Sequence, residues 1–408
     1  MKMLLSLSFR NVLRNRRRTA LTVLLIGFGL ATLILYDGLV IGMSDTFVKN
    51  TTQIFLGEAQ IHREGFRQEL DVDLVVSEWP EVERMLKQDS KVSAYAPRII
   101  ASGMLSSPYN VSAVTINGID PERESTVSKV RQAVLTGEYL TQSSGTGILL
   151  GSRLARLLEV GLGDRVVLTA AQAGGGELVQ ELFRVSGIVE FGSRQMDQVM
   201  IFIPLARAQK LLRLGTDVHE VALRFHSLDD ADDPMLPLRR ALKGKGNELL
   251  SWKELMPQIK AVIEMSKYGT MIMGLILVAV ISMSVINSML MSIHERMFEF
   301  GVLKAVGTRP RNIALMILFE AGALAMISIA VGLVVGAAVS GWFSMTGFDF
   351  AGLEYAGTTL NEPIKTVLVS EQFILFPIFV LLLTVAAGIY PAVHAARLVP
   401  TQAMRRSL

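Results

Sequence analysis

Four long apolar runs divide the chain, at 19–43, 268–293, 312–341 and 372–393. Each run reaches the length of roughly 20 residues that a helix needs to cross the hydrocarbon of a bilayer. The pattern therefore predicts four membrane-spanning helices. The first run exceeds the apolar core of a signal peptide, which has about 7–15 residues, and no clean cleavage site follows it. We therefore expect it to remain as a spanning helix.

A segment of mixed polarity, residues 44–267, separates the first two runs. It contains short stretches in which apolar and polar residues alternate, as they do in half-exposed strands, and other stretches with helical spacing. Strands are expected at 59–62, 111–116, 165–169, 183–189 and 200–203, and helices at 79–88, 151–160 and 204–214. The fold class is thus a polytopic α-helical membrane protein with four transmembrane helices and a large α+β extracytoplasmic domain. Gly174, Gly175 and Gly176 are expected at the flexible tip of a hairpin that spans 170–181.

Composition supports the membrane class and narrows the chemistry. Half of the residues are hydrophobic and the mean hydropathy is +0.42, which is high for a soluble protein. The formal net charge of +3 gives no reason to expect a nucleic-acid partner. The chain has no cysteine, so disulfides, thiol nucleophiles and cysteine metal sites are excluded.

The distribution of basic residues predicts the orientation. Residues 1–18 hold six basic side chains and no acid, and 294–311 and 394–408 also carry arginines. The loop 342–371 has one lysine and four acids. Because basic residues favour the cytoplasmic side, both termini and 294–311 are expected in the cytoplasm. The segment 44–267 and the loop 342–371 would then lie outside the cytoplasm. Residues 1–18 have the spacing of an amphipathic basic helix on the inner membrane surface.

The sequence offers no convincing catalytic, nucleotide-binding or metal site. The triple glycine lacks the Lys-Ser/Thr pair of a phosphate-binding loop, and the five histidines do not cluster at ligand spacing. No Ser/His/Asp arrangement stands out. We therefore expect no catalytic residues and no metal-binding residues. The segment 44–267 is expected to be a binding module or a module that transmits force. Glu320 in the third run and Asp37 in the first are expected to lie near the membrane surfaces, or else to have a functional role.

Two further features of the apolar runs indicate a packing surface and a surface for an apolar ligand. Gly332, Gly336 and Gly341 are expected to let helices approach closely, within the bundle or at a dimer seam. The second run is rich in methionine, which suits an adaptable apolar surface, although ordinary lipid contact explains it as well. The candidate surface for an apolar ligand comprises Phe28, Met43, Met265, Met271 and Met273.

The charged segment 294–311 lies between the second and third runs. Met297, Phe300, Leu303 and Val306 recur at helical spacing, and Gly307 followed by Pro310 ends the helix. We expect a short amphipathic helix whose apolar residues face the membrane or the bundle. Such a helix could insert into a groove of a cytoplasmic partner.

Three motifs resemble the FtsX-like permease family, the membrane subunits of MacB-type ABC transporters. The most specific motif comprises Glu295, Arg296, Glu299, Gly301, Val302, Leu303, Lys304, Ala305, Val306, Gly307 and Arg309. The others are Leu318, Phe319, Glu320 and Ala321, and then Tyr390, Pro391, Ala392, Ala395, Ala396, Arg397, Pro400, Ala403 and Arg405. In the outer segment, Gly118–Pro121, Gly151, Ser152, Leu154, Ala155, Gly163, Asp164, Val185, Gly187 and Ile188 are similar to the lipoprotein-releasing branch.

The resemblance implies an architecture and a set of partners. A porter-like unit at 44–130 and 216–267 would carry a small β-rich insert at 131–215. The residues of the first motif, from Glu295 to Arg309, would couple the chain to a cytoplasmic ABC ATPase homodimer, which would bind ATP and Mg²⁺ in place of this chain. A second permease copy or paralogue, membrane lipids and a lipoprotein cargo are also implied. The apolar surface of Phe28, Met43, Met265, Met271 and Met273 would then be the cargo surface that holds the acyl chains. In that branch one subunit type carries a long hairpin that docks a periplasmic chaperone, and the short 170–181 hairpin lacks the proline and aromatic residues of a rigid arm.

Two other functions fit the same sequence. One is a mechanical transmitter for efflux of peptides, toxins or small molecules from the periplasm. The other is an FtsX-type regulator of periplasmic cell-wall hydrolases. Both would use the same cytoplasmic helix, and they differ from lipoprotein extraction in what the outer domain binds.

Overall fold

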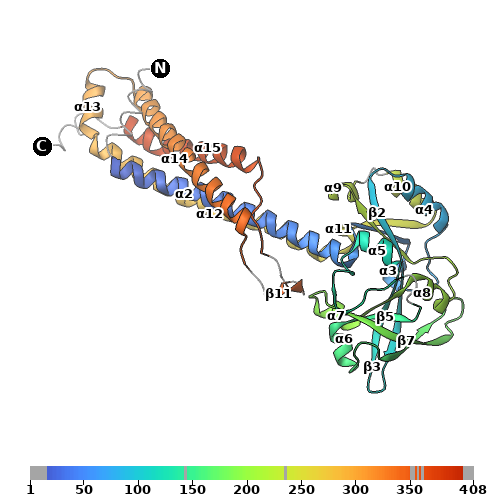
Figure 1. Ribbon diagram of the computed structural model, residues 1–408. Coiled ribbons are helices and arrows are strands. Elements are labelled where there is room, and N and C mark those ends of the chain that lie inside the picture. The colour runs from blue at the N-terminus through green and yellow to red at the C-terminus, as the bar shows by residue number, and fades with distance from the viewer. Residues whose placement is uncertain are drawn as a thin grey trace. The chain divides into compact units, whose positions relative to one another are not determined.

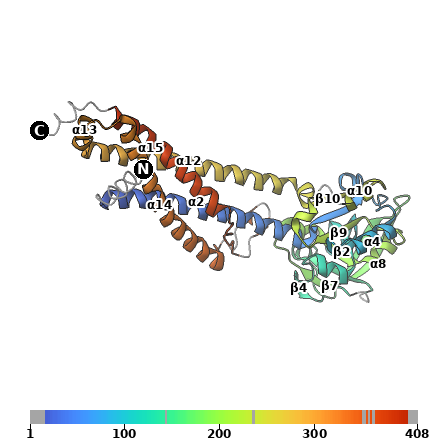
Figure 2. The ribbon, with the colours of Figure 1, turned by 90° about the horizontal axis from the view of Figure 1, so that it is seen from above.

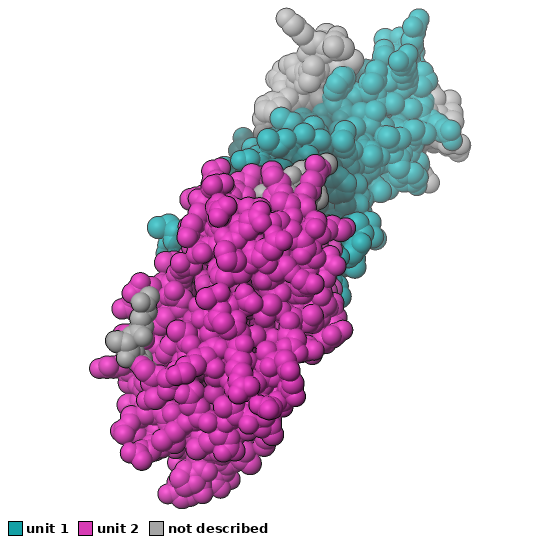
Figure 3. Space-filling model, turned by 90° about the vertical axis from the view of Figure 1, so that its right-hand side faces the viewer, with its two compact units in different colours: residues 1–45, 262–350, 362–408 teal, residues 46–261, 351–361 magenta. Residues whose placement is uncertain are grey.

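The computed structural model describes residues 16–141, 145–233, 237–349, 354–355, 358–359 and 363–397. Most of the predicted basic helix at 1–18 and most of the tail 394–408 therefore lie outside the described residues. The chain forms two compact units, coloured separately in Figure 3. Unit 1 comprises residues 1–45, 262–350 and 362–408, and unit 2 comprises residues 46–261 and 351–361.

Unit 1 contains the four apolar runs, each as one long helix (Figure 1). These helices are α2 (Arg16–Thr51), α12 (Pro257–Glu295), α14 (Pro310–Thr346) and α15 (Gln372–Ala396). All four are long and apolar enough to cross a membrane, as predicted. The helices α2 and α12 continue well past the predicted apolar runs. Hydropathy identifies only the apolar part of a helix, which is the part that lies in the hydrocarbon of the bilayer.

Close helix packing in unit 1 depends on small residues on α2 and α14. A Cβ atom added to Gly332 would lie 2.8 Å from the carbonyl oxygen of Gly27, and one added to Gly336 would lie 3.0 Å from the Cδ1 atom of Ile34. Both glycines therefore pack against α2. Gly341 does not belong to this contact, since a Cβ there would meet nothing within 4 Å. Ser340, four residues after Gly336, occupies the buried position on that face instead.

Unit 2 is built on one ten-stranded mixed sheet, seen from above in Figure 2. Its strands are β1 (Ala59–Arg63), β2 (Val92–Ser106), β3 (Val111–Ile119), β4 (Val134–Gly137), β5 (Gly147–Gly151), β6 (Arg165–Ala171), β7 (Leu178–Val189), β8 (Met200–Pro204), β9 (Glu220–Phe225) and β10 (Asn247–Ser251). The five predicted strands are confirmed, and α4 (Trp79–Gln88), α6 (Ser152–Leu157) and α8 (Leu205–Leu212) confirm the three predicted helices.

Six of the strands close into a ring. The order β2, β3, β8, β5, β7 and β6 returns to β2, because β6 pairs with both β7 and β2. Closure leaves no free edge between these strands. The interior is filled by buried aliphatic side chains and Phe183, to which helices α6 and α8 add Leu154 and Leu211. The ring draws on β2 and β3 as well as on strands of the segment 131–215.

Of the remaining four strands, β4 pairs with β7, and β10, β1 and β9 extend the sheet along the first half of β2. One face of this extension carries an apolar core around Trp79 and Val82 of α4, together with Leu238 and Leu242 of α10 (Pro237–Lys243). Strand alternation turns the intervening residues to the opposite face, and several of these are charged and fully buried.

The buried charges on that face form a network around Arg98. Its guanidinium donates to both carboxylate oxygens of Glu124, at 2.9 and 2.6 Å, and to Glu220 at 2.8 Å. It also lies 3.9 Å from the ring centre of Phe55, in the turn η1 (Thr52–Leu56) that follows α2. Glu124 is supplied by α5 (Pro121–Val127), whose first turn is capped by Asp120. The network therefore links the end of α2, the sheet and α5 within unit 2.

The charge state of this network follows from its contacts. Burial by itself would raise the pKa of the Glu220 carboxyl, but the hydrogen bond from His62 and the charge of Arg98 outweigh burial and hold it at about 2. The folded-state pKa thus lies below the ordinary value. Glu220 consequently stabilises the fold above roughly pH 4.5, and this contribution is lost as the pH falls toward 2.

Replacing Arg98 with methionine should destabilise unit 2 by about 3–5 kcal/mol, because two carboxylates are then buried without their counter-charge. Hydrogen exchange of β2 and β9 in the full chain, held in nanodiscs and titrated with urea, measures the change. The triple variant Arg98→Met, Glu124→Gln, Glu220→Gln is the control and should recover much of the loss. Equal exchange in the wild type and Arg98→Met would contradict the assignment.

Candidate coupling site

The segment between α12 and α14 forms a short helix with defined ends. Helix α12 stops at Glu295, and Arg296 leaves helical geometry with φ −114° and ψ 17°. Helix α13 (Met297–Ala305) follows. At its end Gly307 has φ +96°, and the amides of Gly307 and Thr308 donate to the carbonyls of Lys304 and Leu303, at 3.0 and 2.9 Å. This is a Schellman motif, which requires glycine at the left-handed position.

Arg296 connects α13 to two long helices. Its side chain is only 10% exposed. Its Nε atom donates to Glu299 of α13 at 2.9 Å, and its terminal nitrogen donates to Glu320 of α14 at 3.2 Å. The guanidinium also lies 5.2 Å from the ring centre of Phe300. Ser292 of α12 donates to the other Glu320 oxygen at 3.4 Å. Arg296 and Ser292 thus hold α12, α13 and α14 together through Glu320 and Glu299.

Glu320 is therefore buried and paired. A lone carboxylate inside a spanning helix would cost several kcal/mol, which explains why its partner lies within hydrogen-bonding distance. The resemblance in sequence placed Glu320 and Arg296 in separate motifs, and the structure brings the two motifs into contact.

Further contacts attach this region to the other helices of unit 1. Arg18 of α2 pairs with Glu295 at 2.9 Å, and Lys304 of α13 donates to the carbonyl of Ala396 at 2.6 Å. Ala396 is the last residue of α15, where the free carbonyls of a helix favour a cation. All four long helices are thus connected to the segment that begins at Glu295.

The outer face of α13 is apolar and exposed. Phe298, Val302 and Val306 are 52%, 39% and 82% exposed, whereas Phe300 is buried against the bundle. Met297, Phe300, Leu303 and Val306, which were expected to face the membrane or the bundle, do not share one face of α13. A spacing of three residues drifts by about 60° per step on an α-helix, so Val306 lies opposite Met297. The stripe that remains open is Phe298, Val302 and Val306.

The other predicted coupling residues lie around this helix in different settings. Gly301 is buried beside Phe300, and Glu299 and Lys304 are half-buried. Leu303, Ala305, Gly307 and Arg309 are exposed. Of the nine, Arg296 and Gly301 face inward, and most of the rest are accessible to a partner.

The predicted cargo surface is only partly open in this chain. Phe28 of α2 and Met265 and Met271 of α12 are 66–70% exposed, whereas Met43 and Met273 are half-buried. Only 11% of the apolar window of α12 is buried, and the rest of it is half-buried or exposed. Such a helix presents a large apolar surface to lipid, to cargo or to a second subunit.

The predicted flexible hairpin tip is anchored. The amide of Gly174 donates to Asp73 at 2.7 Å, and the side chain of Gln172 donates to the carbonyl of Leu211 at 2.9 Å. Gly174 and Gly176 have positive φ, as the tight turn requires. The tip is therefore a tight turn that contacts α8 and the loop around Asp73.

Removing the Arg296 side chain should loosen the junction between α13 and α14. Arg296→Met leaves Glu320 buried without a counter-charge, so we expect a loss of about 3–5 kcal/mol in the stability of this junction. Proteolysis and hydrogen exchange of 297–311 in nanodiscs would report it. Arg309→Met, an exposed arginine in the same segment, is the matched control. Unchanged protection in Arg296→Met would contradict the assignment.

The chain matches two described families and several known relatives. Residues 19–234 match the MacB-like periplasmic core domain, and residues 271–400 match the FtsX-like permease C-terminal domain. It is 26% identical to the lipoprotein-releasing system transmembrane protein LolC of Xylella fastidiosa, over 80% of this chain and 81% of that protein. It is 22% identical to the corresponding protein LolE of Haemophilus influenzae, over 81% of each.

Among solved structures, the periplasmic region of MacB from Actinobacillus actinomycetemcomitans aligns with a TM-score of 0.36 and 16% identity, over 52% of this chain and 94% of that one. This likeness is too distant to carry an argument. The match to the periplasmic core domain, in contrast, spans more than half of the chain. The protein therefore belongs to the MacB-like periplasmic core domain family and, with its FtsX-like C-terminal domain, is an ABC transporter permease of the inner membrane with a periplasmic domain.

Proposed function

We propose that this permease transmits motion from a cytoplasmic ATPase to its periplasmic domain in order to extract lipoproteins from the inner membrane. The observation that carries the first part is the junction at Arg296. The exposed stripe of Phe298, Val302 and Val306 offers a partner an apolar contact. Arg296 connects the helix that bears this stripe to Glu320 of α14, and Ser292 of α12 donates to the same carboxylate. A push on α13 would therefore reach two membrane-spanning helices directly.

The partner on the cytoplasmic side would be an ABC ATPase dimer that binds ATP and Mg²⁺. The sequence of this chain has no phosphate-binding loop of its own. The basic residues at 1–18 and 294–311 favour placing α13 and both termini in the cytoplasm. A second permease, either identical or a paralogue, would pair with this chain, and the exposed apolar side of α12 is a suitable surface for it.

Lipoprotein is the cargo that the relatives favour. LolC and LolE are named as lipoprotein-releasing proteins, and the similarity covers about four fifths of the chain. Acyl chains leaving the membrane need an apolar path, and Phe28, Met265 and Met271 provide exposed apolar side chains on α2 and α12. A periplasmic chaperone or adaptor would receive the cargo, although the short hairpin at Gly174–Gly176 offers it no long arm.

The coupling role predicts a specific effect of Gly307→Leu and of Glu299→Lys. The first forces a branched side chain into φ +96°, and the second places a cation next to Arg296. Each should uncouple ATP hydrolysis from transport or lose the ATPase during purification, with at least a tenfold fall in coupled transport. Gly341→Leu is the control, because a side chain there meets open space. Normal ATPase co-purification and transport in both variants would exclude the role.

The cargo assignment is tested by depletion of the protein in living cells. Pulse-labelled lipoproteins should then accumulate in the inner membrane, and a plasmid copy of the chain should restore their release. Release at the normal rate in depleted cells would exclude lipoprotein as the cargo. The same cells, assayed for export of peptides or small molecules, would show whether the chain is an efflux transmitter instead.

A further inference from the structure

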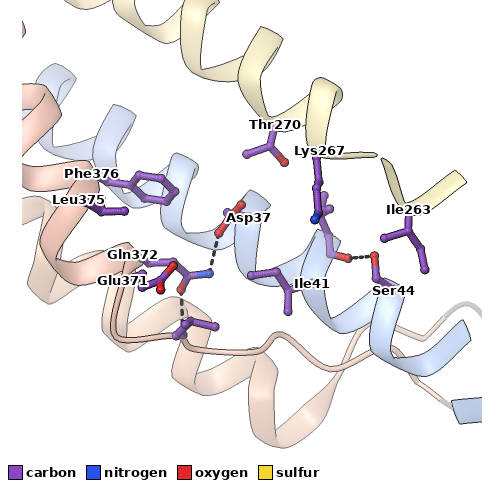
Figure 4. Close-up of a pocket in the computed structure, with 12 residues that line it drawn as sticks. Asp37, Ile41, Ser44, Ile263, Lys267, Thr270, Glu371, Gln372, Leu375 and Phe376 are labelled. Atoms are coloured by element: carbon purple, nitrogen blue, oxygen red, sulfur yellow. Dashed lines mark hydrogen bonds between the residues drawn. The ribbon is translucent and has the colours of Figure 1, made fainter. Parts of the chain in front are cut away.

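A groove lies in unit 1 among α2, α12 and α15 (Figure 4). It encloses about 470 Å³ and is lined by twelve residues, six of them apolar. Three lining residues are charged: Asp37 of α2, Lys267 of α12 and Glu371 at the start of α15. None of the residues that couple α13 to the bundle lines this groove. It is therefore separate from the coupling site.

The groove lies where three apolar runs end on the same side of the bundle. Asp37 is close to the end of the first run, Lys267 directly precedes the second, and Gln372 begins the fourth. These positions correspond to the level at which hydrocarbon gives way to lipid headgroups. Charged side chains above an apolar wall are typical of that level. On the proposed orientation this is the periplasmic leaflet.

A buried amide holds one of the carboxylates at the groove. The side chain of Gln372 is 3% exposed, and its Nε2 atom donates to the Oδ2 atom of Asp37 at 2.8 Å. Its Oε1 atom accepts a hydrogen bond from the amide of Val369 at 3.2 Å. Both ends of the amide are thus engaged, and the dashed lines in Figure 4 mark both bonds. Asp37 is fixed in orientation, while its second oxygen is left for another donor.

The other two charges are available for a ligand. Lys267 points from α12 toward α2 in Figure 4, and Glu371 lies beside Gln372. Within the part of the chain that the structure describes, neither side chain forms an ion pair or a hydrogen bond. The groove therefore presents one cation and two carboxylates beside the apolar side chains of Ile41 and Phe376.

We propose that this groove binds a membrane phospholipid with a primary-amine headgroup, namely phosphatidylethanolamine. Its phosphate would pair with Lys267, its ammonium would donate to Asp37 and Glu371, and an acyl chain would lie along Ile41 and Phe376. A choline headgroup has no N–H to donate to the carboxylates. A phosphatidylglycerol headgroup lacks the ammonium and would place only negative charge against two carboxylates. The proposal requires the membrane location and no particular cargo.

The full-length protein in nanodiscs of equimolar phosphatidylethanolamine, phosphatidylcholine and phosphatidylglycerol provides the test. Native mass spectrometry after release should show phosphatidylethanolamine retained about tenfold over each of the others, the effect of roughly one charge-assisted hydrogen bond. The double variant Asp37→Asn, Glu371→Gln should reduce the preference over phosphatidylcholine to about one. Lys267→Gln should lower retention of all three lipids.

The controls use charged residues of the same helix outside the groove. Lys260→Gln and Glu264→Gln on α12 should retain the wild-type preference. Lys267 and Glu371 are exposed, so Lys267→Gln and the single variant Glu371→Gln should keep the fold, which thermal melting would verify. Equal retention of the three lipids by the wild type, a preference for phosphatidylglycerol, or groove variants that match the controls would each overturn the proposal. These results would leave the lipoprotein-release experiment unaffected.

Discussion

The buried pair of Arg296 and Glu320 is the interaction on which the membrane unit depends. A carboxylate inside a spanning helix is costly unless its counter-charge is close, and here the counter-charge comes from the break between α12 and α13. The requirement to neutralise Glu320 therefore fixes the place where α12 ends. The same guanidinium also orients α13, because it contacts Glu299 and the ring of Phe300. The exposed stripe of α13 is a consequence of this arrangement.

A second buried arginine, Arg98, pairs with two carboxylates in unit 2 in the same way. Arg98 binds two carboxylates from α5 and β9, and it stacks on Phe55 in the turn that follows α2. The end of the first long helix is thus held by charge as well as by apolar packing. In both units, an element that leaves a long helix is fixed by an arginine with two acidic partners. Such sites resist gradual deformation, because separating either pair exposes a buried charge without compensation.

Much of the architecture could be predicted from sequence, since it depends on local patterns. Apolar runs identify spanning helices, alternation identified β3 and β6, and Gly307 marked the end of α13. The longest strand, β2, was missed. It contains Pro97 and Gly103, and its two halves pair with β9 and β6, so no single alternation runs through it. Closure of the ring depends on this long-range pairing, which leaves no local signal.

The candidate sites show the same limit. Sequence indicated that Arg296 and Glu320 matter, but their contact joins residues 24 positions apart. Arg98 is an isolated charge in an apolar stretch, which could have indicated a buried ion pair. An analysis of helical and strand periodicity does not detect such a residue. Gln372 gave no signal, because its role depends on Asp37, 335 positions away. The spacing of three residues also did not separate buried Phe300 from exposed Val306, because the helix rotation that accumulates over several residues decides which side each residue faces.

The central claim is that Arg296 makes α13 move together with the long helices. Spin labels on the exposed residues Val306 of α13 and Val334 of α14 test it directly, in the intact complex and through an ATPase cycle. The account predicts a narrow distance distribution in every nucleotide state of the wild type, and a broad one when Arg296 is replaced by glutamine. A distribution that stays equally narrow in the Arg296→Gln variant would contradict it.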